Sequence, residues 1–248
     1  MIRGIYTSGL GMIRETKRLD VVSNNLANAS TTGFKTEGTV QGNFKKQLDD
    51  IVVAGNKIDI ANYTPDIVRS YTNYTQGSLR STGNLTDLAI SNDNYAFFTV
   101  EDKDGNELYT RDGNFTIDKD RFLVTTDGYR VLGEEGYINL ADDNFAIGID
   151  GKIFNDTGVS LGQVKMTSFT NPETLDKLGN NFLAATETSE KRPFEGEIEQ
   201  GYLEMSNVNT VTEMVNMINI SRAYEANQKV LQVQDEMLGK ATTEVGRI

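Results

Sequence analysis

Residues 207–238 read NVNTVTEMVNMINISRAYEANQKVLQVQDEML, and this stretch decides the fold. It contains neither glycine nor proline, so nothing in it interrupts an α-helix. One line of positions recurs at alternating steps of three and four, the spacing of a helix that packs along a partner helix. These positions are Met217, Ile220, Tyr224, Asn227, Leu231, Gln234 and Leu238.

A second apolar line flanks the first on the same predicted helix. It consists of Val211, Val215, Ile218, Val230, Val233 and Met237. A helix that is apolar on more than one side must be covered on more than one side. We therefore expect a long C-terminal helix that packs on a partner within the chain and on other copies of the chain.

The N-terminal 28 residues carry a similar pattern and predict the partner helix. Its stripe has an average spacing of 3.5 residues and consists of Met1, Ile5, Ser8, Met12, Glu15, Leu19, Val22 and Leu26. Gly4, Gly9 and Gly11 lie in the same stretch, and each costs roughly 1 kcal/mol of helix propensity relative to alanine. This helix should be marginal alone and should need its stripe covered.

The middle of the chain predicts antiparallel strands. Four Asp-Gly pairs supply hairpin-turn signals, and they begin at Asp104, Asp112, Asp127 and Asp150. β-branched and aromatic residues lie between them, at 96–100, 115–117, 122–124 and 146–149. The expected fold class is α+β, with a mainly antiparallel β domain, a sandwich or small barrel, inserted between two terminal helices that pair like a coiled coil.

The expected domain plan follows from these signals. Residues 1–34 form the N-terminal helix and 35–76 an extended linker region, with strand character around 58–74. Residues 77–188 form the β-rich domain and 189–206 a return connector that contains Pro193 and Gly196. Residues 207–248 form the C-terminal helix. The termini would then build one helical unit.

Composition excludes several classes of function. The chain has 248 residues, a formal charge of −12, and neither cysteine nor histidine. Disulfides, Cys/His zinc sites, a cysteine nucleophile and a Ser-His-Asp triad are therefore excluded. The acidic balance argues against nucleic acid, which requires a clustered basic surface. We expect no cofactor, no metal, no catalytic residue and no small-molecule substrate.

Two acidic features invite a chemical interpretation and do not sustain it. Residues 102–106, DKDGN, resemble the start of an EF-hand loop, but its twelfth position is Gly113 and not glutamate. The pairs Glu134-Glu135 and Asp142-Asp143 could be compared with glycosidase carboxylates. Adjacent acids on loops are usually solvated, and we expect a hairpin turn in the first case and surface loops in the second.

Four motifs, in order along the chain, closely resemble the flagellar rod and hook protein family. They are VVSNNLANASTTGFK at 21–35, YTRDGNF at 109–115, QGYLEMSNVN at 200–209, and EMVNMI at 213–218 followed by RAYEAN at 222–227. Together they cover both ends and the centre. Within the family the nearest likeness is to the distal rod proteins. A proximal rod or hook position in the same family is the alternative.

This resemblance implies a structural subunit of the flagellar basal body that stacks helically into a torque-transmitting tube with an export channel. It also implies passage through the flagellar type III export apparatus without a cleaved signal peptide, contacts with other rod and hook proteins, and a homo-oligomeric helical assembly. The residues expected to carry assembly are Ile5, Met12, Leu19, Val22, Leu26, Val215, Ile218, Tyr224, Leu231 and Leu238.

The turn after the first helix forms a second group of candidate residues, namely Asn24, Asn25, Asn28, Gly33 and Phe34. The asparagines are either a polar face that ends in a cap or hydrogen-bonding groups that hold the turn against a neighbour. Gly33 should supply a positive φ angle. Two rival functions remain: a secreted glycan-binding or glycan-cleaving β domain, and an accessory factor present in few copies.

Overall fold

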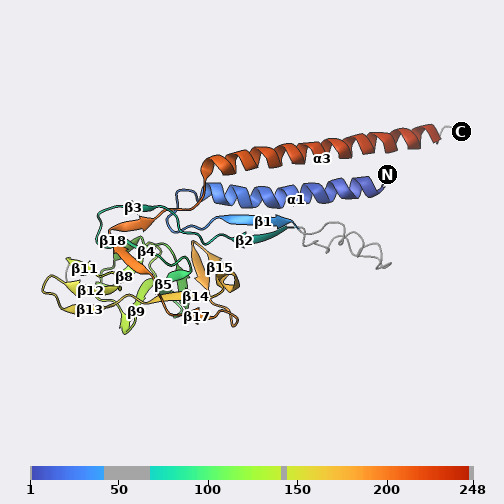
Figure 1. The fold of residues 1–248 in the computed structure, drawn as a ribbon. Coiled ribbons are helices and arrows are strands. Elements are labelled where there is room, and N and C mark those ends of the chain that lie inside the picture. Colours follow the sequence, from blue (N-terminus) through green and yellow to red (C-terminus); the bar gives the residue numbers. More distant parts are fainter. Residues whose placement is uncertain (1, 42–67, 141–143, 246–248) are drawn as a thin grey trace. The chain divides into compact units, whose positions relative to one another are not determined.

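The computed structural model describes residues 2–41, 68–140 and 144–245. Its two long helices are α1 (Ile2–Ala27) and α3 (Thr210–Val245), and short strands form most of the chain between them (Figure 1). The chain forms two compact units. The first contains both helices and one hairpin, and the second contains residues 28–36 and 73–208.

The first unit is an antiparallel helical pair with a two-stranded sheet beside α1 (Figure 1). The sheet consists of β1 (Glu37–Gln41) and β2 (Val68–Thr72), paired antiparallel. α3 begins where the side-chain oxygen of Asn209 accepts a hydrogen bond from the Thr212 N–H at 3.1 Å, the usual N-cap geometry. The prediction of two terminal helices is confirmed, with boundaries near those expected.

Small residues on α1 face amide side chains on α3. A Cβ added to Gly4 would meet Gln234, and one added to Gly11 would meet Asn227. Farther along α1, Asn25 contacts Glu213 at 3.4 Å. Each step of seven residues along α1 matches a step of seven back along α3, which is the heptad register of two antiparallel helices. The glycines that weaken α1 thus make room for amides of its partner.

The second unit is built from antiparallel strands. Its largest sheet has the order β15-β16-β6-β5-β9-β8-β7, with β10 beside β9, β14 beside β5 and β17 beside β14. These strands are β5 (Ala96–Glu101), β6 (Glu107–Thr110), β7 (Phe115–Ile117), β8 (Leu123–Thr125), β9 (Arg130–Gly133), β10 (Gly136–Tyr137), β14 (Met166–Phe169), β15 (Asp176–Gly179), β16 (Phe182–Ala184) and β17 (Lys191–Arg192).

Smaller sheets complete this unit. One has the order β11-β12-β13, and β18 pairs with β4 and β19 with β3. Their bounds are β3 (Leu79–Ser81), β4 (Leu88–Ser91), β11 (Phe145–Ile147), β12 (Lys152–Asn155), β13 (Ser160–Gln163), β18 (Glu197–Gln200) and β19 (Tyr202–Glu204), and a 3₁₀ turn covers Pro172–Thr174. The α+β class is confirmed. Among the described strands β15 and β7 end the large sheet without pairing with each other, so the sheet is not a closed barrel.

The core of the second unit is apolar and almost fully closed to solvent. Its centre includes Leu88, Phe98, Val100, Leu123 and Ile153, each at most 1% exposed. A second, aromatic cluster joins Tyr74, Phe97, Tyr109 and Phe169 with two leucines. Interiors of this kind are close-packed, so the second unit has a core of its own.

Three of the four Asp-Gly pairs form the predicted hairpin turns. Gly105, Gly128 and Gly151 have positive φ angles between paired strands. The prediction for Asp112-Gly113 is wrong, because β6 and β7 on either side of it do not pair with each other. Gly113 instead lies against the β4 backbone, where an added Cβ would fall 1.6 Å from the Leu88 carbonyl oxygen. Close backbone approach, not turn geometry, requires this glycine.

The segments expected to be connectors contain paired strands. Residues 35–76 include β1 and β2, although residues 42–67, with the first part of the extended segment expected at 58–74, lie outside the described residues. Residues 189–206 include β17, β18 and β19, which pair with β14, β4 and β3. The return segment is therefore part of the β unit.

A disulfide tests the helical register. Gly11→Cys combined with Asn227→Cys should form an intramolecular disulfide, because the Cβ position of Gly11 lies 3.3 Å from the Asn227 side-chain carbon and the chain has no other cysteine. Non-reducing electrophoresis and peptide mass spectrometry would detect it. Gly11→Cys with Gln234→Cys, displaced by one heptad, should remain reduced. A disulfide in the second variant and not the first would refute the register.

Candidate functional site

The first candidate site is the outer surface of α3. Large apolar side chains lie exposed on it, from Val211 at 69% to Tyr224 at 37%. The others are Met214, Val215, Ile218, Val230, Val233 and Met237. Only part of the circumference of α3 is covered, since Ile220 is its one buried residue in the described side chains. A soluble monomer rarely exposes so long an apolar surface, which marks α3 as an interaction surface.

The predicted assembly residues divide into two sets. On α1, Val22 is buried and Ile5, Met12, Leu19 and Leu26 are half-buried, as are Leu231 and Leu238 on α3. These seven lie in the helical pair of a single subunit. Val215, Ile218 and Tyr224 are exposed and available to another molecule. The structure therefore separates predicted residues that are covered within the chain from predicted residues that are exposed.

One seam position on α1 is charged and buried. Glu15 is 1% exposed, and its carboxylate accepts hydrogen bonds from Arg14 at 2.7 Å and Arg18 at 2.8 Å. A buried carboxylate is tolerated because cations partner it. Glu15 thus keeps its place in the apolar stripe without an unpaired charge.

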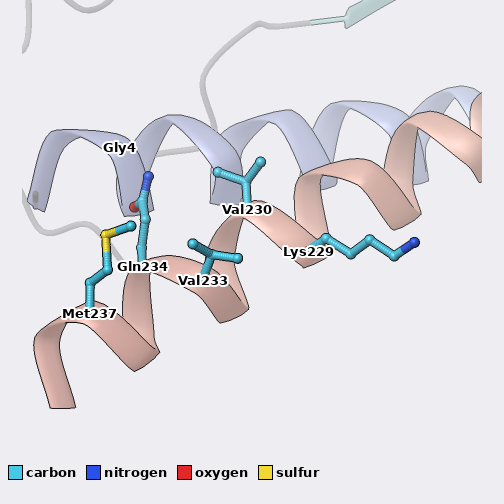
Figure 2. A pocket seen from close by; sticks show the side chains of 6 residues that line it. All are labelled: Gly4, Lys229, Val230, Val233, Gln234 and Met237. Carbon is cyan, nitrogen blue, oxygen red and sulfur yellow. The ribbon is translucent and has the colours of Figure 1, made fainter. Parts of the chain in front are cut away.

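A groove lies between α1 and α3 toward the N-terminal end of α1 (Figure 2). Its volume is about 530 Å³, and its lining consists of Gly4, Lys229, Val230, Val233, Gln234 and Met237. The side chain of Gln234 points toward Gly4 (Figure 2). Its carbonyl oxygen is buried and has no hydrogen-bond partner in the part of the chain that the structure describes.

The second candidate site is a buried ion cluster in the β unit. The carboxylate of Glu204 on β19 pairs with the Lys35 ammonium and, at 3.2 Å, with the Arg111 guanidinium. All three side chains are at most 6% exposed. They come from the loop after α1, the segment after β6 and the return strand, which are three of the four motifs singled out in the sequence.

Backbone groups complete the cluster. The Lys35 ammonium also donates to the Thr75 carbonyl at 3.0 Å, and the Gly77 N–H donates to Glu204 at 2.8 Å. Arg111 donates to the carbonyls of Ala96 and Asp93 at 2.7 and 2.8 Å. Buried charges are stable only when paired and hydrogen-bonded in this way.

Lys35 and Arg111 share the Glu204 carboxylate, and the pKa values of both cations are lowered. The pKa of Lys35 is lowered from 10.5 to about 8, because burial and, to a smaller extent, the Arg111 charge outweigh the opposing effect of Glu204. Burial likewise lowers the pKa of Arg111. The cost of removing water from the Lys35 ammonium exceeds its attraction to Glu204, so the fold disfavours the charged form of this side chain.

The loop before Lys35 requires glycine. Gly33 has a φ of +68°, as predicted, and its N–H donates to the Glu204 carbonyl at 2.8 Å. A Cβ at this position would lie 2.5 Å from the Arg111 carbonyl carbon. The turn therefore brings the backbone of the first motif directly against the other two. Phe34 beside it is buried.

Two asparagine side chains, one in each unit, form hydrogen bonds with backbone groups as a neighbouring strand would. The Asn207 oxygen accepts from the Thr36 N–H at 2.8 Å, and its amide donates to the carbonyls of Asn73 and Thr75. Within the helical unit, Asn25 exchanges two hydrogen bonds with the Glu37 backbone, at 2.7 and 2.9 Å.

The other two asparagines of the turn differ from Asn25. Asn25 is 1% exposed, whereas Asn24 is exposed, and Asn28 caps the turn through its carbonyl, which accepts from the Thr31 N–H at 3.1 Å. The observed partners of Asn25 and Asn28 thus lie within the chain itself.

The ion cluster is what sequence reasoning missed. Lys35, Arg111 and Glu204 stood inside recognised motifs, yet nothing in their spacing shows that three segments up to 169 residues apart meet. The available signal was a charged residue in each of the three motifs, since Lys35 and Glu204 are the only charged residues in 21–35 and 200–209. Charge balance across motifs would have suggested the pairing.

The carboxylates singled out in the sequence form no site. Asp102 accepts from the N–H groups of Asp104 and Asn106, the geometry of the predicted hairpin turn, and Asn106 lowers its pKa. Glu134 and Glu135 are exposed, and Asp142-Asp143 lies outside the described residues. Within the described ranges no three acidic side chains gather as metal ligands. No helix there has the length and apolarity needed to cross a bilayer.

Comparison with known protein families places the chain in a class. Residues 5–35 match a model described as "Flagella basal body rod protein", and 89–155 match "Flagellar hook protein FlgE/F/G D1 domain". Residues 199–244 match "Flagellar basal body rod FlgEFG protein C-terminal". The class is that of the rod and hook proteins of the bacterial flagellum.

Individual relatives narrow the class. The flagellar basal-body rod protein FlgG of Borreliella burgdorferi is 34% identical over 97% of this chain and 98% of its own length. FlgG of Bacillus subtilis is 34% identical, covering 96% and 97%. FlgF of Caulobacter vibrioides is 35% identical, covering 94% and 93%. The chain belongs to the flagellar basal-body rod protein family.

Removing the shared carboxylate tests the ion cluster. Glu204→Gln removes the carboxylate that pairs with both buried cations, so the free energy of unfolding should fall by about 3–5 kcal/mol. Urea denaturation followed by near-ultraviolet circular dichroism measures it. The same substitution at half-buried Glu199 on β18 should change stability by less than about 0.5 kcal/mol. Equal effects at both positions would contradict the role of the cluster.

The lowered pKa of Lys35 predicts a specific pH dependence. Between about pH 8 and 10.5 the unfolded chain holds a proton on this residue that the folded chain has released, so stability from this group rises with pH. Across this range the unfolding free energy of the wild type should rise relative to that of Lys35→Met by up to about 3 kcal/mol. Parallel curves from pH 7 to 10.5 would refute it.

Proposed function

We infer that this chain is a structural subunit of the flagellar basal-body rod that assembles helically with copies of itself. One observation carries the proposal: α3 exposes eight large apolar side chains that its own subunit leaves uncovered. A member of the rod protein family that assembles with its own copies needs such a surface, because each contact between copies must bury apolar side chains. The β unit supplies a rigid body with a closed core.

The energetics favour assembly from several neighbours together. Full burial of one such side chain stabilises by about 1.5–3 kcal/mol, so covering the exposed half of eight of them offers roughly 6–12 kcal/mol. Association costs about 4–15 kcal/mol in lost freedom of motion. A single pairwise contact is therefore weak, while a lattice of contacts is stable. Such a subunit stays soluble when dilute and polymerises above a threshold concentration.

The role that we infer is mechanical and not enzymatic. Copies form a rigid tube that transmits torque and contains a channel for export. The subunit is exported by the flagellar type III apparatus without a cleaved signal peptide, and it contacts other rod and hook proteins. Absence of histidine and cysteine supports a non-catalytic role, since the commonest general base and the thiol nucleophile are unavailable.

Within the rod we infer the distal position, as in relatives named FlgG. The alternative is the FlgF position, since one relative with that name is equally similar. Expression in bacteria lacking either protein separates them. Restored motility in cells lacking FlgG supports the distal position, and restoration only in cells lacking FlgF contradicts it.

An aspartate on the exposed surface tests the function. Val215→Asp should prevent polymerisation of the purified chain, because a charge would enter the buried contact, while the subunit keeps its fold. Sedimentation and negative-stain microscopy report assembly, and circular dichroism reports folding. Gln228→Asp places the same charge on another exposed part of α3 and should assemble normally.

Leu26 and Leu231 are less suitable probes, because both are half-buried in the helical pair and an aspartate there would also disturb the subunit. Normal polymers of Val215→Asp would remove this surface from the assembly. Failure of the wild-type chain to polymerise at any concentration would contradict the function itself.

A further inference from the structure

The exposed apolar residues of α3 form two triplets with the same spacing. Val211, Met214 and Ile218 are separated by three and four residues, and so are Val230, Val233 and Met237. The first triplet, here called the ridge, is between 50% and 69% exposed. The second, here called the groove triplet, lines the groove beside Gly4 and Gln234 (Figure 2).

We propose that the ridge of one copy docks in the groove of the next, with the two α3 helices parallel and displaced by 19 residues. This proposal rests on the proposed function and specifies which surfaces meet. At 1.5 Å per residue the displacement is about 28 Å along the helix. It brings Val211 level with the partner's Val230, Met214 with the partner's Val233, and Ile218 with the partner's Met237.

The direction of the two triplets determines the kind of assembly. Each residue of an α-helix turns by about 100°, so a step of 19 residues leaves the triplets facing directions about 100° apart. A two-fold dimer joins the same patch of both subunits, whereas the two triplets face different directions and do not form one patch. A ridge-to-groove contact uses a different surface from each copy and extends without closing.

A second copy is the occupant that covers both triplets of the same helix. Each chain brings one ridge and one groove triplet, so a polymer covers both on every interior copy. A different partner protein would fill one and leave the other exposed. No charged residue belongs to either triplet, and of the described residues that line the groove Lys229 alone is charged. Three half-exposed side chains from each copy are too few for a stable isolated pair, which fits cooperative assembly.

The groove has the shape that such a contact needs. Gly4 contributes no side chain at its floor, and the amide of Gln234 occupies that space. The Gln234 side-chain oxygen is buried and has no hydrogen-bond partner in the described chain. A docked helix would remove water from the groove and so raise the cost of this unpaired oxygen, unless that helix donates a hydrogen bond to it. Val230, Val233 and Met237 of α3 give the groove an apolar lining beside Gly4, and this lining complements a row of apolar side chains.

Complementary charges test the pairing with the full-length chain. Ile218→Lys places a cation on the ridge, and Met237→Glu places an anion in the groove. Each variant alone should raise the concentration needed for polymerisation at least about tenfold, because a charge must enter an apolar contact. An equal mixture should polymerise again, since the altered ridge then meets the altered groove and the intact ridge meets the intact groove. The polymer should contain both variants in equal amounts.

Two further measurements keep the result interpretable. Circular dichroism and the disulfide between positions 11 and 227 show that each variant keeps its helical pair. A mixture of Met214→Cys and Val233→Cys chains should give mixed crosslinked dimers under oxidation, and the chain has no other cysteine. Homodimers of either single variant alone should be rare.

The outcomes separate this proposal from the function. Wild-type polymers combined with a mixture that fails to assemble, or with Ile218→Lys assembling as wild type does, would overturn the ridge-to-groove contact and leave the rod function intact. A wild-type chain that stays monomeric throughout would overturn both. Restored alternating polymers and mixed crosslinks would support both.

Discussion

The carboxylate of Glu204 is the point on which the β unit depends. It holds Lys35 from the loop that follows α1 and Arg111 from the central sheet, and it accepts from the Gly77 backbone. Buried ion clusters are seldom more stable than apolar packing of the same volume, but breaking one is costly. Here the cluster joins three segments of the β unit that are far apart in the sequence.

The two units use opposite physical strategies. The β unit closes its core, with its central side chains at most 1% exposed, and fastens its edges with asparagine and ion contacts. The helical unit leaves much of α3 uncovered and accepts glycines in α1. The assembly proposed above would use both, because one part would hold its shape alone and neighbouring copies would cover the other. Glycine opposite amide side chains adds register to a helical pair that would otherwise slide.

Periodicity in the sequence was sufficient to predict the helices, and turn chemistry was sufficient for most of the sheet. The spacing of Ile220, Leu231 and Leu238 identified the side of α3 toward α1, and Asp-Gly pairs marked three hairpins. The same signal failed at Gly113, because a glycine needed for close backbone contact has the same local sequence as one needed for a turn.

The ion cluster was beyond local reasoning, since Lys35 and Glu204 are brought together only by the complete fold. The strands of the return segment were missed for a related reason. β18 and β19 are short and pair with β4 and β3 more than a hundred residues earlier, so local propensity carries little of their signal.

The pairing of β18 with β4 and of β19 with β3 affects the order in which parts of the chain can fold. The partners of β3, β4 and the Lys35 side chain all lie beyond residue 196. A chain that becomes available from its N-terminus onward therefore cannot complete the β unit until about four-fifths of it is present. Pairings of such high contact order form slowly. A chain that lacks its last fifth would therefore have no complete β unit, whatever the state of its first helix.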